Sequence, residues 1–490
     1  MGMAGCSEDA PHWQQIGIES GFQSAWVETE ATKIEVGDSR DKDMEKEKRT
    51  AGEAGWHVSR YNVSAKIPGE KATAIVNLMK GTCAKYNPME LYLLDVLEEL
   101  DEDHPIIERF ARRGIITRVD ERAALELMGR GACMASGAVS LTICPTMNCN
   151  FDCPYCFEGH RPGKMSPEVQ EDVIGLVGRM MKAGKAELLS VTWFGGEPLL
   201  AVDVIEGLSE RLIRLAEEYH ARYEAEIVTN GYLLNRKNIE ILERCRVGKC
   251  QITIDGIGAA HDATRHLAGG GATFDRIIRN IREKRIPFQV SIRQNVQESN
   301  VEEIPRVREF VRLLREDSGN DIVYHAAAVQ NNETAVKRGK EPRLLCEKDL
   351  MGIEIADSTD YFEKGKGHYC GAHMLWSVGI DEKGNLFKCW EAVADPAYAF
   401  ATARDWDPLN PLESAFAPDK LTMYMNTALP TEDEECRECV WLPACTGGCP
   451  HKRLFYQKDC LSFRDHPEEY VLSLYGRLKE KIADRENHKE

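Results

Sequence analysis

The chain has 490 residues, about three domains at the usual size of roughly 150 residues each, so a single small core is excluded. Its 62 Lys and Arg against 80 Asp and Glu give a formal net charge of −18, which argues against nucleic acid or an anionic membrane surface as a partner. No apolar run approaches the roughly 20 residues that span a membrane, and the N-terminus has no apolar signal core. We therefore expect a soluble, cytoplasmic protein.

The first quarter of the chain predicts a mobile extension and a small α/β module. Residues 1–54 lack apolar periodicity and include the charged tract Asp38–Arg49, which is typical of a disordered extension. Residues 55–131 read as a winged-helix-like module. Its strands are expected at 61–67, 72–79 and 114–119, and its helices at 86–100 and 106–113. The acidic residues 97–103 argue against DNA as its ligand.

Residues 138–330 alternate between strand and helix patterns. Strands are expected at 139–144, 188–194, 225–229, 250–254, 288–293 and 322–329. Helices are expected at 167–183, 202–223, 235–244, 274–284 and 301–315. Repeated βα units predict an α/β fold with a parallel sheet, which we interpret as a partial (β/α)6 TIM-like barrel with its site at the carboxyl ends of the strands.

The alternation stops beyond residue 330. Residues 331–369 are expected to form a linker, residues 370–465 a loop-rich cysteine domain, and residues 466–490 a closing helix. A segment with so few periodic apolar residues needs metal cross-links to hold its shape.

Cysteine is clustered rather than scattered along the chain. There are 17 cysteines, and in a reducing compartment such clusters usually serve metals or redox chemistry. The first cluster, Cys149, Cys153 and Cys156, has the spacing CxxxCxxC just after the first barrel strand. Three thiolates are one ligand short of a structural zinc site, whereas on a cubane iron–sulfur cluster they leave one iron open. Cys144 is more consistent with buried packing than with ligation.

The CxxxCxxC spacing followed by the aromatic Phe157 resembles the signature of radical S-adenosylmethionine (SAM) enzymes. The resemblance implies that the three cysteines bind a 4Fe-4S cluster whose open iron is chelated by SAM. Electron transfer to SAM would then release methionine and a 5′-deoxyadenosyl radical.

Other strand ends also match that family. Residues 193–198, Trp-Phe-Gly-Gly-Glu-Pro, resemble its GGEP motif, and further polar residues end the following strands. The resemblance implies SAM contacts from Phe157, Gly195, Gly196, Glu197, Thr229, Asn230, Asp255, Arg265 and Asn295. Taken singly, these residues could equally be turn glycines, a turn asparagine or a surface cation.

A second cysteine block resembles the SPASM domain, which carries two auxiliary 4Fe-4S clusters in radical SAM maturases. The resemblance implies one cluster on Cys436, Cys439, Cys445 and Cys460, and another on Cys370, Cys389 and Cys449. A pair of structural zinc sites is the alternative. The second set lacks a fourth thiol nearby, which leaves Cys346, His373 or an open iron that binds substrate.

The combination of modules resembles maturases of ribosomally made, post-translationally modified peptides (RiPPs). There the N-terminal module, a RiPP recognition element, binds a leader peptide by strand addition. The expected reaction is an intramolecular crosslink, either a thioether or a carbon–carbon or carbon–oxygen bond. Glu391 and Asp255 are candidate bases, and flavodoxin or ferredoxin is the expected electron donor.

Two alternatives remain open at this stage. An anaerobic sulfatase maturase, which makes formylglycine on a protein, shares both cysteine blocks. In those relatives an aspartate follows the GxxxxC cysteine, where this chain has Trp390. The other alternative is a non-catalytic, metal-stabilised binding protein.

Overall fold

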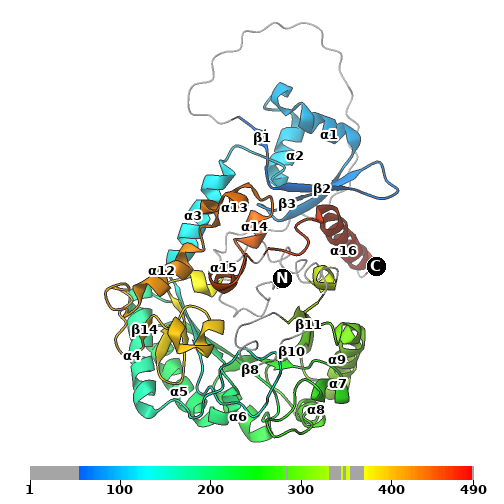
Figure 1. Cartoon of the computed structure of the whole chain (residues 1–490). Helices are drawn as coiled ribbons and strands as arrows, with labels where there is room; N and C mark the ends of the chain where they lie inside the picture. Colours follow the sequence, from blue (N-terminus) through cyan, green and yellow to red (C-terminus); the bar gives the residue numbers. More distant parts are fainter. Residues whose placement is uncertain are drawn as a thin grey trace, which may run out of the picture.

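The computed structural model describes residues 55–282, 285–329, 344–345, 349–353, 369–458 and 460–487. The expected extension over residues 1–54, Cys346 and nearly all of the predicted linker lie outside the described residues. A small N-terminal module lies at one end, a strand–helix barrel at the other, and the cysteine-rich segment packs between them (Figure 1). No described helix has the length and apolar character needed to cross a membrane.

The N-terminal module is built on a three-stranded antiparallel sheet in the order β2-β3-β4. Its strands are β2 (Asn62–Lys66), β3 (Thr73–Asn77) and β4 (Thr82–Tyr86), and a separate pair joins β1 (His57–Val58) to β5 (Ile116–Thr117). Its helices are α1 (Pro88–Asp95), η2 (Leu97–Glu99), α2 (Pro105–Arg113) and α3 (Glu121–Met134). Strand β4 and helix α3 were not predicted from the sequence. The strand expected at 114–119 pairs with β1 and does not join the hairpin.

The barrel contains all six strands that the sequence predicted. They are β6 (Ala138–Ile143), β7 (Leu188–Trp193), β8 (Arg222–Thr229), β9 (Val247–Thr253), β10 (Gln289–Val296) and β11 (Ile322–Ala328), each parallel to its neighbours. The helices α4 (Pro167–Gly184), η3 (Pro198–Ala201), α5 (Val202–Glu218), α6 (Arg236–Arg244), α7 (Ala259–Asp262), α8 (Phe274–Arg282), η4 (Val301–Glu303) and α9 (Ile304–Ser318) connect them. Ser166 caps α4 by accepting from the Val169 N–H. The prediction of a partial α/β barrel is therefore confirmed.

The cysteine-rich segment extends the barrel sheet instead of standing apart from it. Strand β12 (Ser377–Ile380) pairs in parallel with β6, and β13 (Asn385–Phe387) and β14 (Ala401–Thr402) follow in antiparallel. The sheet thus has nine strands in the order β11-β10-β9-β8-β7-β6-β12-β13-β14. The other elements are η5 (Gly371–His373), η6 (Glu391–Ala394), η7 (Pro396–Tyr398), α12 (Pro418–Asn426), η8 (Pro430–Glu432), α13 (Glu434–Glu438), α14 (Leu442–Cys445), α15 (Pro450–Phe455) and the closing α16 (Pro467–Asn487).

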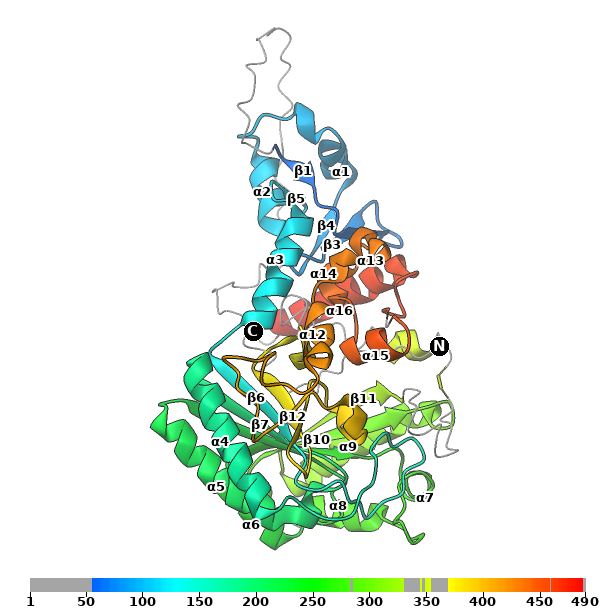
Figure 2. The same ribbon diagram turned by 60° about the vertical axis from the view of Figure 1, so that its left-hand side comes forward.

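The N-terminal sheet is buried on both faces. One face packs on Phe110 of α2 and its neighbours, while the other shares a core with Trp441, Phe463 and Leu474 of the C-terminal segment. Helix α16 lies along the sheet in both views (Figure 2). The N-terminal module is thereby fixed to the segment that carries the second cysteine block.

Candidate functional site

The first cysteine loop is held at the carboxyl end of β7 by a close backbone approach. A Cβ added to Gly196 would lie 2.4 Å from the carbonyl oxygen of Asn148, and one on Gly195 would lie 2.4 Å from that of Thr146. Gly195 also has a φ of +106°, which disfavours a side chain. The Gly196 and Glu197 N–H groups donate to those same two carbonyls at 3.2 and 2.8 Å. The two glycines therefore fix the chain that leads into Cys149.

Glu197 joins the ends of two strands. The carboxylate is fully buried and accepts from the Thr229 hydroxyl at 2.6 Å and from the Asn230 N–H at 2.8 Å. The Asn230 amide in turn donates to Asn150 in the cysteine loop at 2.8 Å. Burial raises the pKa of Glu197, and these hydrogen bonds oppose the rise. All of these predicted residues are thus brought together around the loop.

Tyr155, between the second and third cysteines, anchors the loop on the opposite side. Its hydroxyl donates to Asp255 at 2.5 Å and accepts from Arg265 at 2.7 Å. Asp255 also accepts from the Asn295 N–H at 3.3 Å, while the Asn295 side chain accepts from Arg293 at 2.9 Å. Burial raises the pKa of Asp255. Tyr155 was not predicted from the sequence as a site residue, although a phenol between two candidate ligand cysteines is a signal of a loop contact.

The three thiols of this loop lie near one another in a buried setting. Burial raises the pKa of Cys149 to about 12, and Glu197 and Cys153 act in the same direction. Burial also raises the pKa of Cys156, and Cys153 and Glu158 add to it. Thiols that raise one another's pKa favour a bound cation, because metal binding replaces their protons. The donor set therefore fits a thiolate-bound cluster.

The seven cysteines from Cys370 to Cys460 lie in two groups. The pKa of Cys389 is raised by burial, then by Cys449, Glu391 and Cys370. Burial likewise raises the pKa of Cys445 to about 12, with contributions from Cys460, Cys439 and Cys436. Two guanidinium groups border the second group, since Arg453 donates to Cys436 at 3.3 Å and Arg464 to Cys460 at 3.4 Å. Each group therefore concentrates thiols as the predicted sets require.

Over the described residues, no three His, Cys, Asp or Glu side chains converge on a point where one metal ion could bind. A single zinc ion needs its ligands within roughly 2.0–2.3 Å of one point. A cubane cluster instead spreads its ligands over several irons.

Three aromatic rings connect the first cysteine loop to the second block. Phe157 stacks on Phe194 with 6.3 Å between centroids, and Phe194 stacks on Trp390 at 5.4 Å. These residues follow Cys156, precede Gly195 and follow Cys389 in sequence. The stack therefore links the residue after Cys156 to the residue after Cys389.

The segment after the first cysteine loop docks on the turn that carries Glu391. A Cβ on Gly159 would lie 2.5 Å from the Ala394 carbonyl oxygen. Arg161 donates to that carbonyl at 3.0 Å and to Glu382 at 3.0 and 3.1 Å. Burial raises the pKa of Glu158 to about 8, and the charge of nearby Glu391 adds to the rise. Cys144 is fully buried beside this junction, in a cluster that includes Phe387 and Val393, as its apolar setting predicts.

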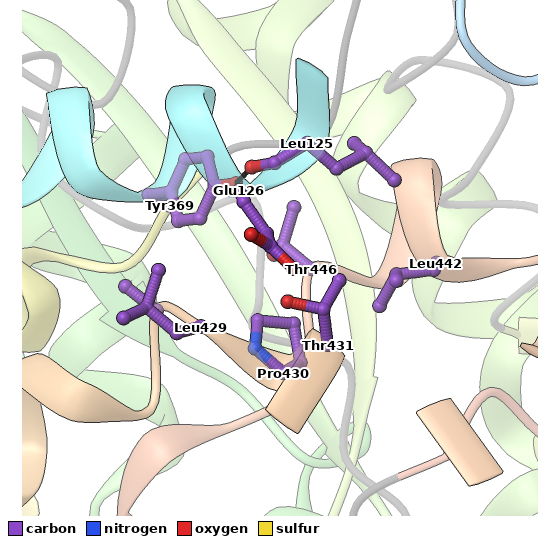
Figure 3. A pocket seen from close by; sticks show the side chains of 9 residues that line it. Leu125, Glu126, Tyr369, Leu429, Pro430, Thr431, Leu442 and Thr446 are labelled. Carbon is purple, nitrogen blue, oxygen red and sulfur yellow. Dashed lines mark hydrogen bonds between the residues drawn. The ribbon is translucent and has the colours of Figure 1, made fainter. Parts of the chain in front are cut away.

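A cavity of about 10 Å³ lies between α3 and the second cysteine block (Figure 3). Leu125, Tyr369, Pro430 and Thr446 are among its lining residues, and the Tyr369 hydroxyl donates to the Leu125 carbonyl at 3.4 Å. That volume holds about one water molecule. The cavity is therefore a packing gap at the junction and cannot hold a peptide or a nucleoside.

Comparison with known proteins gives one matching family. The model of the radical SAM superfamily matches residues 143–311. The sporulation killing factor maturation protein SkfB of Bacillus subtilis is 28% identical over 173 residues, which are 35% of this chain and 39% of that protein. The Fe-coproporphyrin III synthase of Methanosarcina barkeri is 27% identical over 340 residues, covering 62% of this chain and 80% of that protein.

One solved structure shares the fold over most of its length. Native anSMEcpe with bound AdoMet and Cp18Cys peptide superimposes with a TM-score of 0.53 at 18% identity. The match covers 71% of this chain and 99% of that one. At that identity the likeness concerns the fold alone.

Proposed function

We propose that the chain is an enzyme of the radical SAM superfamily, whose model matches residues 143–311, and that it matures a ribosomally made precursor peptide by installing an intramolecular crosslink. The bond is a thioether or a carbon–carbon or carbon–oxygen link. The observation that carries the proposal is the aromatic stack of Phe157, Phe194 and Trp390, which links the residue after Cys156 to the residue after Cys389. Such an arrangement suits a substrate radical that must lose a second electron near its place of formation.

The family implies a 4Fe-4S cluster and SAM, and the first cysteine loop fits them. Cys149, Cys153 and Cys156 would hold the cluster. The predicted SAM contacts are Phe157, Gly195, Gly196, Glu197, Thr229, Asn230, Asp255, Arg265 and Asn295. When bound, the clusters and SAM supply the hydrogen-abstracting radical and accept the electron released as the new bond forms.

The residues of the chain would do the positioning. Tyr155 holds Arg265 and Asp255 against the cysteine loop, where both side chains would be available to contact SAM. Burial without bulk water keeps these polar contacts strong. Exclusion of water also protects a reactive radical from side reactions.

Two auxiliary clusters complete the proposal. One would lie on Cys370, Cys389 and Cys449, and the other on Cys436, Cys439, Cys445 and Cys460. The peptide would give one hydrogen atom to the 5′-deoxyadenosyl radical, which becomes 5′-deoxyadenosine, and would then lose a proton and an electron as the bond closes. Glu391, beside Cys389, or Asp255 would take the proton, and flavodoxin or ferredoxin would reduce the first cluster.

The N-terminal module is the proposed leader-peptide site. Both sheet faces are covered, so binding would occur at an edge. The loop after α2 covers the start of the β2 edge. There the Ser59 N–H and the Asn62 amide donate to the Ile115 carbonyl. Strand β4 pairs only with β3 in this sheet, which leaves its outer edge for strand addition.

The similarity to a maturation protein supports a peptide substrate. SkfB is named as the maturation protein of a sporulation killing factor, but the matched stretch spans less than half of its length. The Fe-coproporphyrin III synthase shows that a relative of similar identity is named for a small tetrapyrrole product. The experiment must therefore test the peptide directly.

The test has two stages, both without oxygen. Reconstituted enzyme should cleave SAM to 5′-deoxyadenosine, and the Cys149→Ala variant should not. Co-expression with a small peptide encoded beside the gene should then yield product lighter by two hydrogen atoms. SAM cleavage without any mass change in such peptides would contradict the proposal.

Formylglycine formation is the second candidate, favoured by the fold shared with anSMEcpe. The position after Cys389 is occupied by Trp390, whose indole is stacked and carries no proton acceptor. An aldehyde on the product, detected by hydrazide labelling, would support this candidate instead.

A further inference from the structure

His373 is a buried side chain whose polar atoms have no partner. It is 1% exposed, and neither ring nitrogen has a hydrogen-bond partner in the described part of the chain. Its ring contacts Tyr369 edge-on at 5.7 Å between centroids. Burying a donor and an acceptor without replacing their water contacts is costly, so such a group calls for an explanation.

His373 lies next to Cys370, a member of the set that lacks a fourth thiol. It ends η5, which begins directly after Cys370, and its N–H donates to the Cys370 carbonyl at 2.9 Å. The two cations whose charges act on its ring are Lys388 and Arg453. Lys388 precedes Cys389, and Arg453 lies one helical turn after Cys449.

The surrounding elements converge on the same place. Helix η5 packs against α12 and β12. Tyr424 of α12 lies near Cys389 and Cys449, and its hydroxyl is 2.5 Å from Nδ1 of His451. His451, unlike His373, therefore has its polar partner within the protein.

We propose that His373 is the fourth protein ligand of the metal group held by Cys370, Cys389 and Cys449. Imidazole nitrogen is an established substitute for thiolate in iron–sulfur centres. This inference rests on the proposed auxiliary cluster and specifies the protein ligand of its fourth iron.

A consequence concerns substrate access. With His373 bound, this group has no open iron for a thiolate of the peptide. If His373 is not the fourth ligand, that place is taken by Cys346 or by substrate. Both alternatives are outcomes of the experiment below.

The experiment uses the full chain with Cys149, Cys153 and Cys156 all replaced by Ala, so that only the auxiliary groups contribute. After anoxic iron and sulfide loading it should hold about eight irons per chain, four for each cubane. Pulsed electron paramagnetic resonance of the reduced protein should detect a strongly coupled nitrogen. His373→Ala should abolish this coupling, whereas the matched variant His451→Gln should retain it. His373→Cys should keep the iron and lose the coupling.

The failures are distinguishable. Full iron without any nitrogen coupling would overturn the role of His373 and leave both clusters in place. About four irons that persist in Cys370→Ala would mean that the cluster on Cys370 is absent, and both proposals would fall. If the parent shows no nitrogen coupling and Cys346→Ala loses one cluster, Cys346 is the ligand of the fourth iron. Should the triple variant fail to fold, the same histidine variants are compared in the chain with all its cysteines.

Discussion

The indole of Trp390 lies nearly parallel to the ring of Phe194, with 5.4 Å between the centroids and 17° between the planes. Phe194 ends the strand region before the paired glycines, and Trp390 follows a cysteine of the second block. This contact therefore joins two parts of the chain that are almost 200 residues apart in sequence.

Removing the indole should separate radical formation from product formation. Trp390→Ala deletes half of the stack and should lower the apparent free energy of unfolding by roughly 2 kcal/mol. We expect crosslinked peptide to fall by at least about tenfold, or 1.4 kcal/mol in the barrier, while 5′-deoxyadenosine is still released. Mass spectrometry measures the crosslinked peptide, and chromatography of the same reaction measures 5′-deoxyadenosine. Trp390→Phe preserves an aromatic ring and should behave nearly as wild type; equal losses in both variants would contradict a stacking role.

Tyr155→Phe tests the loop anchor. The change leaves Asp255 and Arg265 buried, each with one hydrogen bond fewer, which costs roughly 1–3 kcal/mol. We expect SAM binding to weaken by about tenfold or more while the iron content stays unchanged, as measured by equilibrium dialysis with labelled SAM. The control is Tyr219→Phe, which removes a hydroxyl that donates to Gly178 at the surface. Unchanged SAM affinity in Tyr155→Phe would show that the anchor has no part in binding.

The barrel could be predicted from sequence because its strands are buried apolar runs that alternate with capped helices. The cysteine sets rest on ligand spacing, which is a local property of the sequence, and their binding of clusters stays a prediction. Strand β12 could not, since Ser377–Ile380 is four residues long and gains its place only by pairing with β6. Strand β4 was missed because its polar residues Thr82 and Lys85 hide the alternation that burial of Ala84 and Tyr86 reveals.

Gly196→Ala tests the close approach that holds the first loop. The added methyl would lie 2.4 and 2.6 Å from the carbonyl oxygens of Asn148 and Met147, so the backbone before Cys149 must move. We expect loss of about four irons per chain and of SAM cleavage, with the auxiliary signals retained. Gly131→Ala, where a Cβ meets nothing within 4 Å on helix α3, is the control and should favour the helix slightly. Normal iron content in Gly196→Ala would mean that the loop tolerates displacement.

Hydrogen exchange can locate the leader peptide. Strand addition forms main-chain hydrogen bonds along one edge, so peptide binding should slow exchange at the amides of Thr82–Tyr86. The other edge, Asn62–Lys66, serves as the internal control and should be unaffected. Protection confined to the β2 edge would place the peptide on the opposite side of the sheet, and protection of neither would exclude strand addition here.

His261 should make stability depend on pH. Its ring is fully buried, and Nδ1 accepts the Asp255 N–H at 3.3 Å, while burial and the nearby Arg265 lower its pKa from 6.5 to about 3. Between those values the unfolded chain binds a proton that the folded chain does not, so acidification favours unfolding. From pH 7 to pH 5 this histidine alone should cost about 2 kcal/mol at 1.36 kcal/mol per pH unit. His261→Gln keeps an acceptor for the backbone, and its anoxic urea unfolding curves should shift less between these two pH values than those of wild type. Equal shifts would show that His261 is protonated in the folded chain.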